Sequence, residues 1–276
     1  MLAAFVIHEL SHPRPWINLR FAVNGNMPLL LLFISFFRFV LLSTSYIIPQ
    51  YLTTVQNYRA MEIGGVLKWI ALPQFLTAPV VATILRFVDA RFIMALGFAL
   101  VGCACFMAGQ LTHDWVGVDF LPSQLVQAVG QSFALTSLVW FALKHLQPTE
   151  IFTFGAVLQT GRLFGAQLGT AFVQTFVRTR EQTYSNLIGL HINAGSLLTD
   201  QRLDDYAQAV AGRSVGQPEA AARATALLAR SVQNQAYVLA YIDGFMILGF
   251  AVIGALLLML LLRDPPANIE QTAARK

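Results

Sequence analysis

Six long apolar runs constrain this chain more than any other feature of its sequence. An α-helix rises about 1.5 Å per residue, so roughly 20 apolar residues cross a hydrocarbon core of ~30 Å. Backbone groups inside lipid must bond within their own segment, and runs of this length do so as helices. The sequence therefore predicts an all-α, polytopic membrane protein with about six transmembrane helices. The predicted spans cover residues 27–50, 63–85, 91–110, 121–143, 152–177 and 238–262.

Composition agrees with this prediction and excludes several classes of function. Only 12% of the 276 residues are charged, about half of what a soluble domain carries. The basic residues form no patch interleaved with aromatic residues, which argues against nucleic-acid binding. No phosphate-binding or nucleophile-elbow motif is present, and Cys103 and Cys105 lie two positions apart on one predicted helix, where they cannot easily pair. We predict no enzyme, no cofactor and no metal.

The basic residues of the short loops predict the orientation of the chain in the membrane. Eight of them fall on one side of the predicted spans, whereas Arg59 stands on the other. Since the side richer in Lys and Arg is normally cytoplasmic, we expect both termini there, including residues 1–26 and the tail 264–276. The eight are Arg14, Arg20, Arg86, Arg91, Lys144, Arg263, Arg275 and Lys276.

The long segment 178–237 is extracytoplasmic in this scheme and has helical patterning of its own. Residues 199–212 have a helix start and a glycine stop. Pro218 opens an alanine-rich stretch that we expect to lead into the last span. The segment is either a lid or docking surface or a solvated helical hairpin without a role in chemistry.

Four ionisable residues within the predicted spans stand out, because charges at bilayer depth are costly and usually face a cavity or a partner. Arg38 is near the middle of its span, and we favour a position at the central cavity. Lys68 lies near a membrane surface, which a long side chain can reach. Arg162 is interpreted as a cavity residue, a member of an ion pair or a phosphate ligand. Asp243 carries a proton, caps the inner end of the loop helix or pairs with a basic neighbour.

Small and polar residues on the predicted spans suggest helix packing and a polar cavity. Gly161, Gly165 and Gly169 are four residues apart and fall on one helix face, where they allow another helix to approach closely. Gln127 and Gln131 also share a face and are candidates for lining a cavity. Other glutamines lie in or beside the spans, and three prolines interrupt the first two. They are Gln74, Gln124, Gln159, Gln167 and Gln174, with Pro49, Pro73 and Pro79.

Residues 8–12 match the zinc-protease pattern H-E-x-x-H in a formal sense. That pattern requires both histidines on one helix face, with the glutamate beside bound water. Pro13 disfavours helix at His12, and no third ligand is near in the sequence. We therefore reject a metalloprotease.

The motifs and their order resemble one family. The lead-in PRPWINLRFAVNGN, the stretch IIPQYLTTVQNYRAMEIGG, the loop LRFVDARF and the run LQTGRLFGAQLGTA are similar to segments of the fourteen-span drug:proton antiporters, the EmrB/QacA-like branch of the major facilitator superfamily. The chain would correspond to spans nine to fourteen, preceded by the end of the eighth helix. One departure is Gln127, which stands where the branch usually has arginine, and another is that the N-terminal half of such a transporter is missing.

This resemblance implies a function, a set of site residues and partners. It implies one six-helix half of a proton-coupled exporter of drug-like or toxic molecules in a bacterial inner membrane. Arg38, Arg162 and Asp243 would serve the cavity or the proton coupling, while Arg86, Asp89 and Arg91 would gate the cytoplasmic side. Partners would be lipid, substrate and protons, the missing half or a second copy, and a periplasmic adaptor protein. The alternative is a truncated, non-transporting protein that only associates with others.

Overall fold

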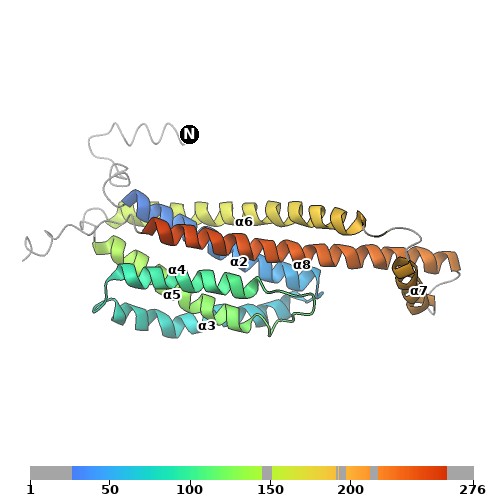
Figure 1. Cartoon of the computed structure of the whole chain (residues 1–276). Helices are drawn as coiled ribbons and strands as arrows, with labels where there is room; N and C mark the ends of the chain where they lie inside the picture. Colours follow the sequence, from blue (N-terminus) through green and yellow to red (C-terminus); the bar gives the residue numbers. More distant parts are fainter. Residues whose placement is uncertain (1–26, 145–150, 191, 193–196, 212–216, 260–276) are drawn as a thin grey trace, which may run out of the picture.

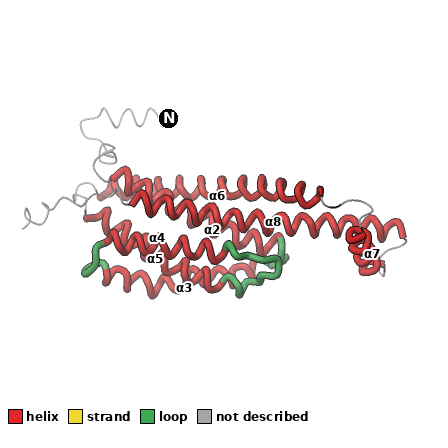
Figure 2. The backbone as a smooth tube through the Cα atoms, viewed as in Figure 1, coloured by secondary structure: helices red, strands yellow, loops and turns green. Residues whose placement is uncertain are grey.

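A computed structural model describes residues 27–144, 151–190, 192, 197–211 and 217–259. This part of the chain is all-α, with seven helices, and the connections described within it are loops and turns (Figure 2). The expected lead-in 1–26 and the tail 264–276 lie outside it. The helices are α2 (Met27–Thr54), α3 (Ala60–Ile84), α4 (Ala90–Ala108), α5 (Leu121–Lys144), α6 (Ile151–Leu190), α7 (Leu197–Ala211) and α8 (Gln217–Met259).

Five of these helices are long and apolar enough to cross a membrane, which makes the chain a multi-pass membrane protein. They are α2, α3, α4, α5 and α8. The sixth predicted span, 152–177, lies within α6, which is not among the five. Arg162 and several glutamines interrupt its apolar sequence, and the helix continues past residue 177 to Leu190. The number of helices that meet these criteria is therefore five, against about six predicted from the sequence.

The long helices pack in a pattern that relates one half of the bundle to the other. The long helices α2 to α6 run in alternating directions, so α2 and α6 run parallel, as do α3 and α5 (Figure 1). α2 packs on α6 as α5 packs on α3, and α4 packs on α5 as α8 packs on α2. The helices α2, α3 and α4 therefore correspond to α5, α6 and α8, respectively. Each pair of corresponding helices makes these same contacts but runs in opposite directions. The exception is the broad α6–α8 contact, because α3 and α4 make almost none.

α2 lies at the centre of the bundle and α3 at its edge. In their most apolar stretches, half of the residues of α2 are buried, against 6% of those of α3. Phe37 of α2 packs on Phe98 of α4, and Tyr51 packs on Phe120 and Tyr241. On α3, by contrast, Phe75 is 82% exposed. α3 thus presents a wide apolar face that the described residues do not cover.

The α6 and α8 helices extend well beyond the other four long helices. Figure 1 shows both continuing past the ends of α2 to α5, with α7 lying against the far part of α8. No break separates the alanine-rich stretch from the last predicted span, since α8 is one helix from Gln217 to Met259. The segment predicted to lie outside the membrane thus includes the outer ends of α6 and α8 together with α7.

Candidate functional site: polar groups within the bundle

The contact between α2 and α6 is close because glycines occupy one side of it. A methyl group placed on Gly165 would lie 2.0 Å from the backbone oxygen of Ser35, and one on Gly169 would lie 2.4 Å from that of Phe39. One on Gly161 would lie 2.9 Å from the hydroxyl oxygen of Ser35. The Ser43 hydroxyl also donates a 3.0 Å hydrogen bond to the Gly169 carbonyl. Only glycine allows two backbones to approach this closely.

We call this close contact the α2–α6 seam. Two arginines lie beside it, and neither has an acidic partner among the described residues. Arg38 is partly buried on α2 and Arg162 is partly buried on α6. The Nε atom of each is fully buried and makes no hydrogen bond. The positive charge of Arg162 acts on Arg38, so the two guanidinium groups lie within electrostatic reach of each other. The structure therefore brings together two of the residues proposed for the cavity.

Polar groups at the contact between α3 and α5 pair with each other instead. The Gln74 amide donates a 2.6 Å hydrogen bond to the Gln131 side-chain oxygen. The Thr77 hydroxyl donates a 2.6 Å hydrogen bond to the Ser132 hydroxyl. Gln131 and Ser132 are buried, whereas their partners on α3 are partly exposed. These bonds hold the otherwise exposed α3 against the bundle.

The second glutamine proposed for the cavity, Gln127, also has a partner. Its amide donates a 2.7 Å hydrogen bond to the Thr44 hydroxyl, which joins α5 to α2. One turn away, Gln124 is fully buried, and its amide nitrogen and oxygen make no hydrogen bond within the described residues. A neutral amide without partners costs free energy in an apolar interior. Gln124 and Gln127 thus place a polar stripe on the side of α5 that faces α2.

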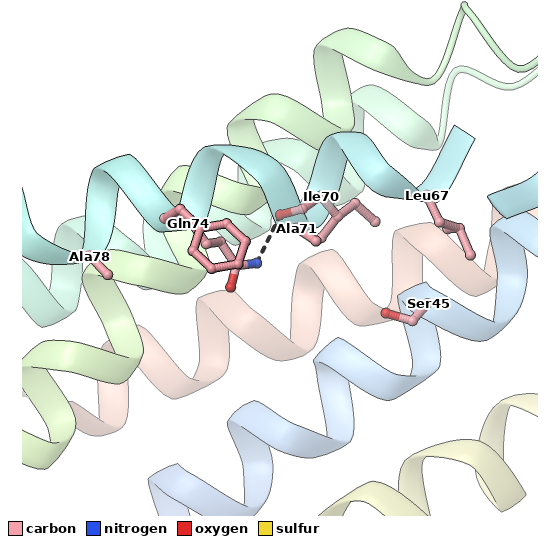
Figure 3. Close-up of a pocket in the computed structure, with 7 residues that line it drawn as sticks. Ser45, Leu67, Ile70, Ala71, Gln74 and Ala78 are labelled. Carbon is pink, nitrogen blue, oxygen red and sulfur yellow. Dashed lines mark hydrogen bonds between the residues drawn. The ribbon is translucent and has the colours of Figure 1, made fainter. Parts of the chain in front are cut away.

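A groove of about 580 Å³ opens between α2 and α3. Ser45 stands on its α2 side and Gln74 on its α3 side, as Figure 3 shows. Apolar side chains make up the rest of its wall, namely Leu67, Ile70, Ala71, Phe75 and Ala78. A mainly apolar groove with a few polar groups is the usual form of a site for a small amphipathic molecule.

Asp243, the acidic residue proposed for coupling, is held in an ion pair. Its Oδ2 atom lies 2.5 Å from a terminal guanidinium nitrogen of Arg180 and accepts a 2.7 Å hydrogen bond from Tyr184. Of the three interpretations of the sequence, pairing with a basic neighbour is therefore the one seen in this geometry. The hydrogen bond to the carboxylate, together with burial, raises the pKa of the Tyr184 phenol.

The residues proposed for the cytoplasmic gate lie around the start of α4. Asp89 caps this helix by accepting a hydrogen bond of 3.1 Å from the Arg91 backbone nitrogen. The Arg91 guanidinium lies 5.5 Å from the centre of the Phe141 ring, while Arg86 is exposed. The structure gives this loop a capping role, and its gating role stays a prediction.

Lys68 and the three glutamines of α6 lie at the surface of the described structure. Lys68 is exposed, with its ammonium group 5.5 Å from the ring of Trp69. Gln159, Gln167 and Gln174 are exposed on α6. No group of His, Cys, Asp and Glu in the described ranges is arranged to hold a metal, and His8 and His12 lie outside those ranges.

The sequence identified the ionisable groups of the spans but not the residues with which they pair. The sequence predicts that Arg180 and Tyr184 lie in the outer loop, because the apolar run of α6 ends near residue 177. The available signal was the absence of any proline between Ile151 and Leu190, which allows one uninterrupted helix. Ser35 and Thr44 had no signal in the sequence, since their contacts depend on how α2 packs.

Comparison with known proteins assigns no family to this arrangement. No protein-family model matches the chain, and no curated protein matches it.

Proposed function

We propose that this chain is one six-helix half of a proton-coupled exporter of small amphipathic molecules. The observation that carries the proposal is the order of helix packing. Exchanging α2, α3 and α4 for α5, α6 and α8 preserves the helix contacts with reversed direction, apart from the α6–α8 contact and with α6 taken as a sixth span. Inverted repeats of three helices within a six-helix half are the plan of major facilitator transporters.

The uncovered faces of the bundle support the same proposal. The groove between α2 and α3 is open on one side, and α3 and α6 both carry large exposed apolar side chains. In a major facilitator transporter, the substrate site lies between two halves. A second six-helix unit, either another part of a longer chain or a second copy, would cover these faces and close the groove. The outer ends of α6 and α8 would then stand outside the membrane, where an adaptor protein could bind.

The ionisable groups give the proposal its chemistry. Arg38 and Arg162 would meet the substrate, and Asp243 would take and release the proton. Protonation of Asp243 would remove the negative charge that holds Arg180 and would loosen α6 from α8. In this way a proton would change the packing of two helices, as alternating access requires.

Proton-linked transport by the chain in proteoliposomes tests this function. Vesicles loaded with a pH-sensitive dye would receive a lipophilic cation such as ethidium or a lipophilic anion such as 4-(1-pyrenyl)butyrate. Proton flux above that of empty vesicles, lost in Asp243→Asn, is the expected result. Equal flux in the two proteins would remove Asp243 from coupling.

Flux in neither protein would favour the second candidate, a membrane protein that associates with others and does not transport. The exposed apolar faces of α3 and α6 favour association in either case. Crosslinking in the membrane would then detect the second unit without any transport.

A further inference from the structure

The arginines beside the α2–α6 seam project from the same edge of that seam. Arg38 follows the contact residue Ser35 by three positions, and Arg162 precedes the contact residue Gly165 by three. In two parallel helices, a residue three positions after the contact on one helix and a residue three positions before it on the other lie on the same edge of that contact. The repulsion that Arg162 exerts on Arg38 agrees with this placement.

Both arginines are partly buried, and both lie far from the ends of their helices. Each is eleven residues from the first residue of its helix, Met27 or Ile151, which corresponds to about 16 Å. This is about half of a hydrocarbon core of ~30 Å. A lipid phosphate at the membrane surface would therefore have to be drawn far inward to reach them.

No acidic side chain of the described helices lies at this depth. α2, α4 and α5 contain no Asp or Glu. The one acidic residue on α6 is Glu181, about 28 Å further along the helix. Two guanidinium groups with buried, unbonded Nε atoms therefore lie on the same edge of the α2–α6 contact, without a carboxylate from these helices. Such an arrangement is costly unless an anion completes it.

The edge that carries the arginines is also the edge that faces the groove. Ser45, which lines the groove, is seven residues after Arg38 and thus on the same face of α2, about 10 Å away. An elongated molecule could place its apolar part along Leu67, Ile70 and Phe75 and its charged end between the arginines. Arginine forks bind planar oxyanions through two parallel hydrogen bonds.

We infer that Arg38 and Arg162 form a binding site for an anionic oxygen group, and that the molecule bound in the adjoining groove is an amphipathic carboxylate. This inference rests on the proposed function, because it names the class of substrate. A lipid phosphate offers similar oxygen ligands and is the competing source of the anion.

Equilibrium dialysis of the full chain in lipid nanodiscs tests the site without requiring transport. The probe is 4-(1-pyrenyl)butyrate, compared with the matching pyrenyl alcohol and pyrenyl trimethylammonium, and binding to empty nanodiscs is subtracted. We expect the carboxylate to bind at least about tenfold more tightly than either analogue. Equal binding of the alcohol would overturn the inference.

Substitutions assign the binding to the two arginines. Arg38→Gln and Arg162→Gln should each weaken carboxylate binding about tenfold, and the Arg→Lys variants should lose less because they keep the charge. Lys68→Gln, which removes an exposed cation of α3, should bind as the parent does. An equal loss in Lys68→Gln, or none in the arginine variants, would contradict the site. If a glutamine variant fails to fold, the lysine variants still decide the outcome.

Lipid composition separates the two sources of the anion. Nanodiscs of phosphatidylcholine alone should bind the probe as strongly as discs that also contain phosphatidylglycerol. Arginine-dependent competition by phosphatidylglycerol would assign the site to a lipid headgroup and overturn the substrate class. Binding without proton flux would retain the site and reject the exporter, whereas flux unaffected by either arginine would retain the exporter and reject the site.

Discussion

The seams α2–α6 and α3–α5 occupy equivalent positions in the two halves of the bundle, yet they differ in whether the polar side chains beside them are paired. In α3–α5, Gln74 and Gln131 satisfy each other through a hydrogen bond. In α2–α6, glycines bring the backbones together, and the arginines beside them find no partner within the described chain. Paired groups stabilise the packing, while unpaired charges are retained at a cost in stability. This difference fits the proposal that one seam serves structure and the other serves a ligand.

Gly165→Ala should give the largest effect, because it attacks the closeness of α2 and α6 directly. The added methyl group would meet the Ser35 backbone oxygen, which no side-chain rearrangement can move. We expect a loss of about 3 kcal/mol in the free energy of unfolding, seen as a lower Tm in detergent. Gly155→Ala on the same helix is the control, since nothing lies within 4 Å of the added methyl group. Equal melting of the two variants would show that the seam is loose.

How far the sequence predicts this molecule depends on which kind of contact is considered. The apolar runs predict helices because length and hydropathy act locally, and the glycine spacing predicts a close contact on α6. Neither pattern names the partner surface, Ser35 and Phe39 on α2, because that choice depends on the packing of the whole bundle. For the same reason, the sequence identified Asp243 as unusual but left its partner open. Arg180 becomes available only because α6 continues past its apolar run.

Gln131→Leu should produce the next largest effect. It weakens the α3–α5 seam, to which we assign a structural role. Removal of the acceptor leaves the Gln74 amide with one hydrogen bond, to the Ile70 carbonyl. We expect a loss of about 1 to 2 kcal/mol, measured as a lower Tm. The double variant Gln74→Leu/Gln131→Leu should recover most of it, because both polar partners are then gone. An additive loss would mean that the two side chains act independently.

Arg38→Met should have the opposite sign, and this tests the comparison most directly. The substitution removes a charge that is repelled by Arg162 and has no acidic partner among the described residues. We expect the unliganded protein to gain about 1 kcal/mol in stability, since a well-packed apolar side chain often replaces a buried charge favourably. Thermal unfolding without any carboxylate measures this gain. A clear decrease in Tm would indicate that Arg38 has a stabilising partner. The α2–α6 seam would then serve structure, as α3–α5 does.

Tyr184→Phe should give the smallest effect, because the α6–α8 contact that it weakens is partly open to water. Arg180 there is 43% exposed and Asp243 24% exposed, so the loss of one hydrogen bond should cost less than about 1 kcal/mol at pH 8. The bond to Asp243 raises the pKa of this phenol in the folded protein. Its contribution is therefore fully present below the ordinary phenol pKa of about 10 and is lost as the pH rises through the folded value.

The difference in Tm between the parent and Tyr184→Phe should accordingly stay constant from about pH 6 to 9 and shrink at higher pH. Tyr206→Phe on α7 controls for the loss of a phenol elsewhere. A difference that remains unchanged into strongly alkaline solution would show that Tyr184 stabilises this contact through its ring and not through the bond to Asp243. The polar connection between α6 and α8 that a proton can release would then consist of the Arg180–Asp243 ion pair alone.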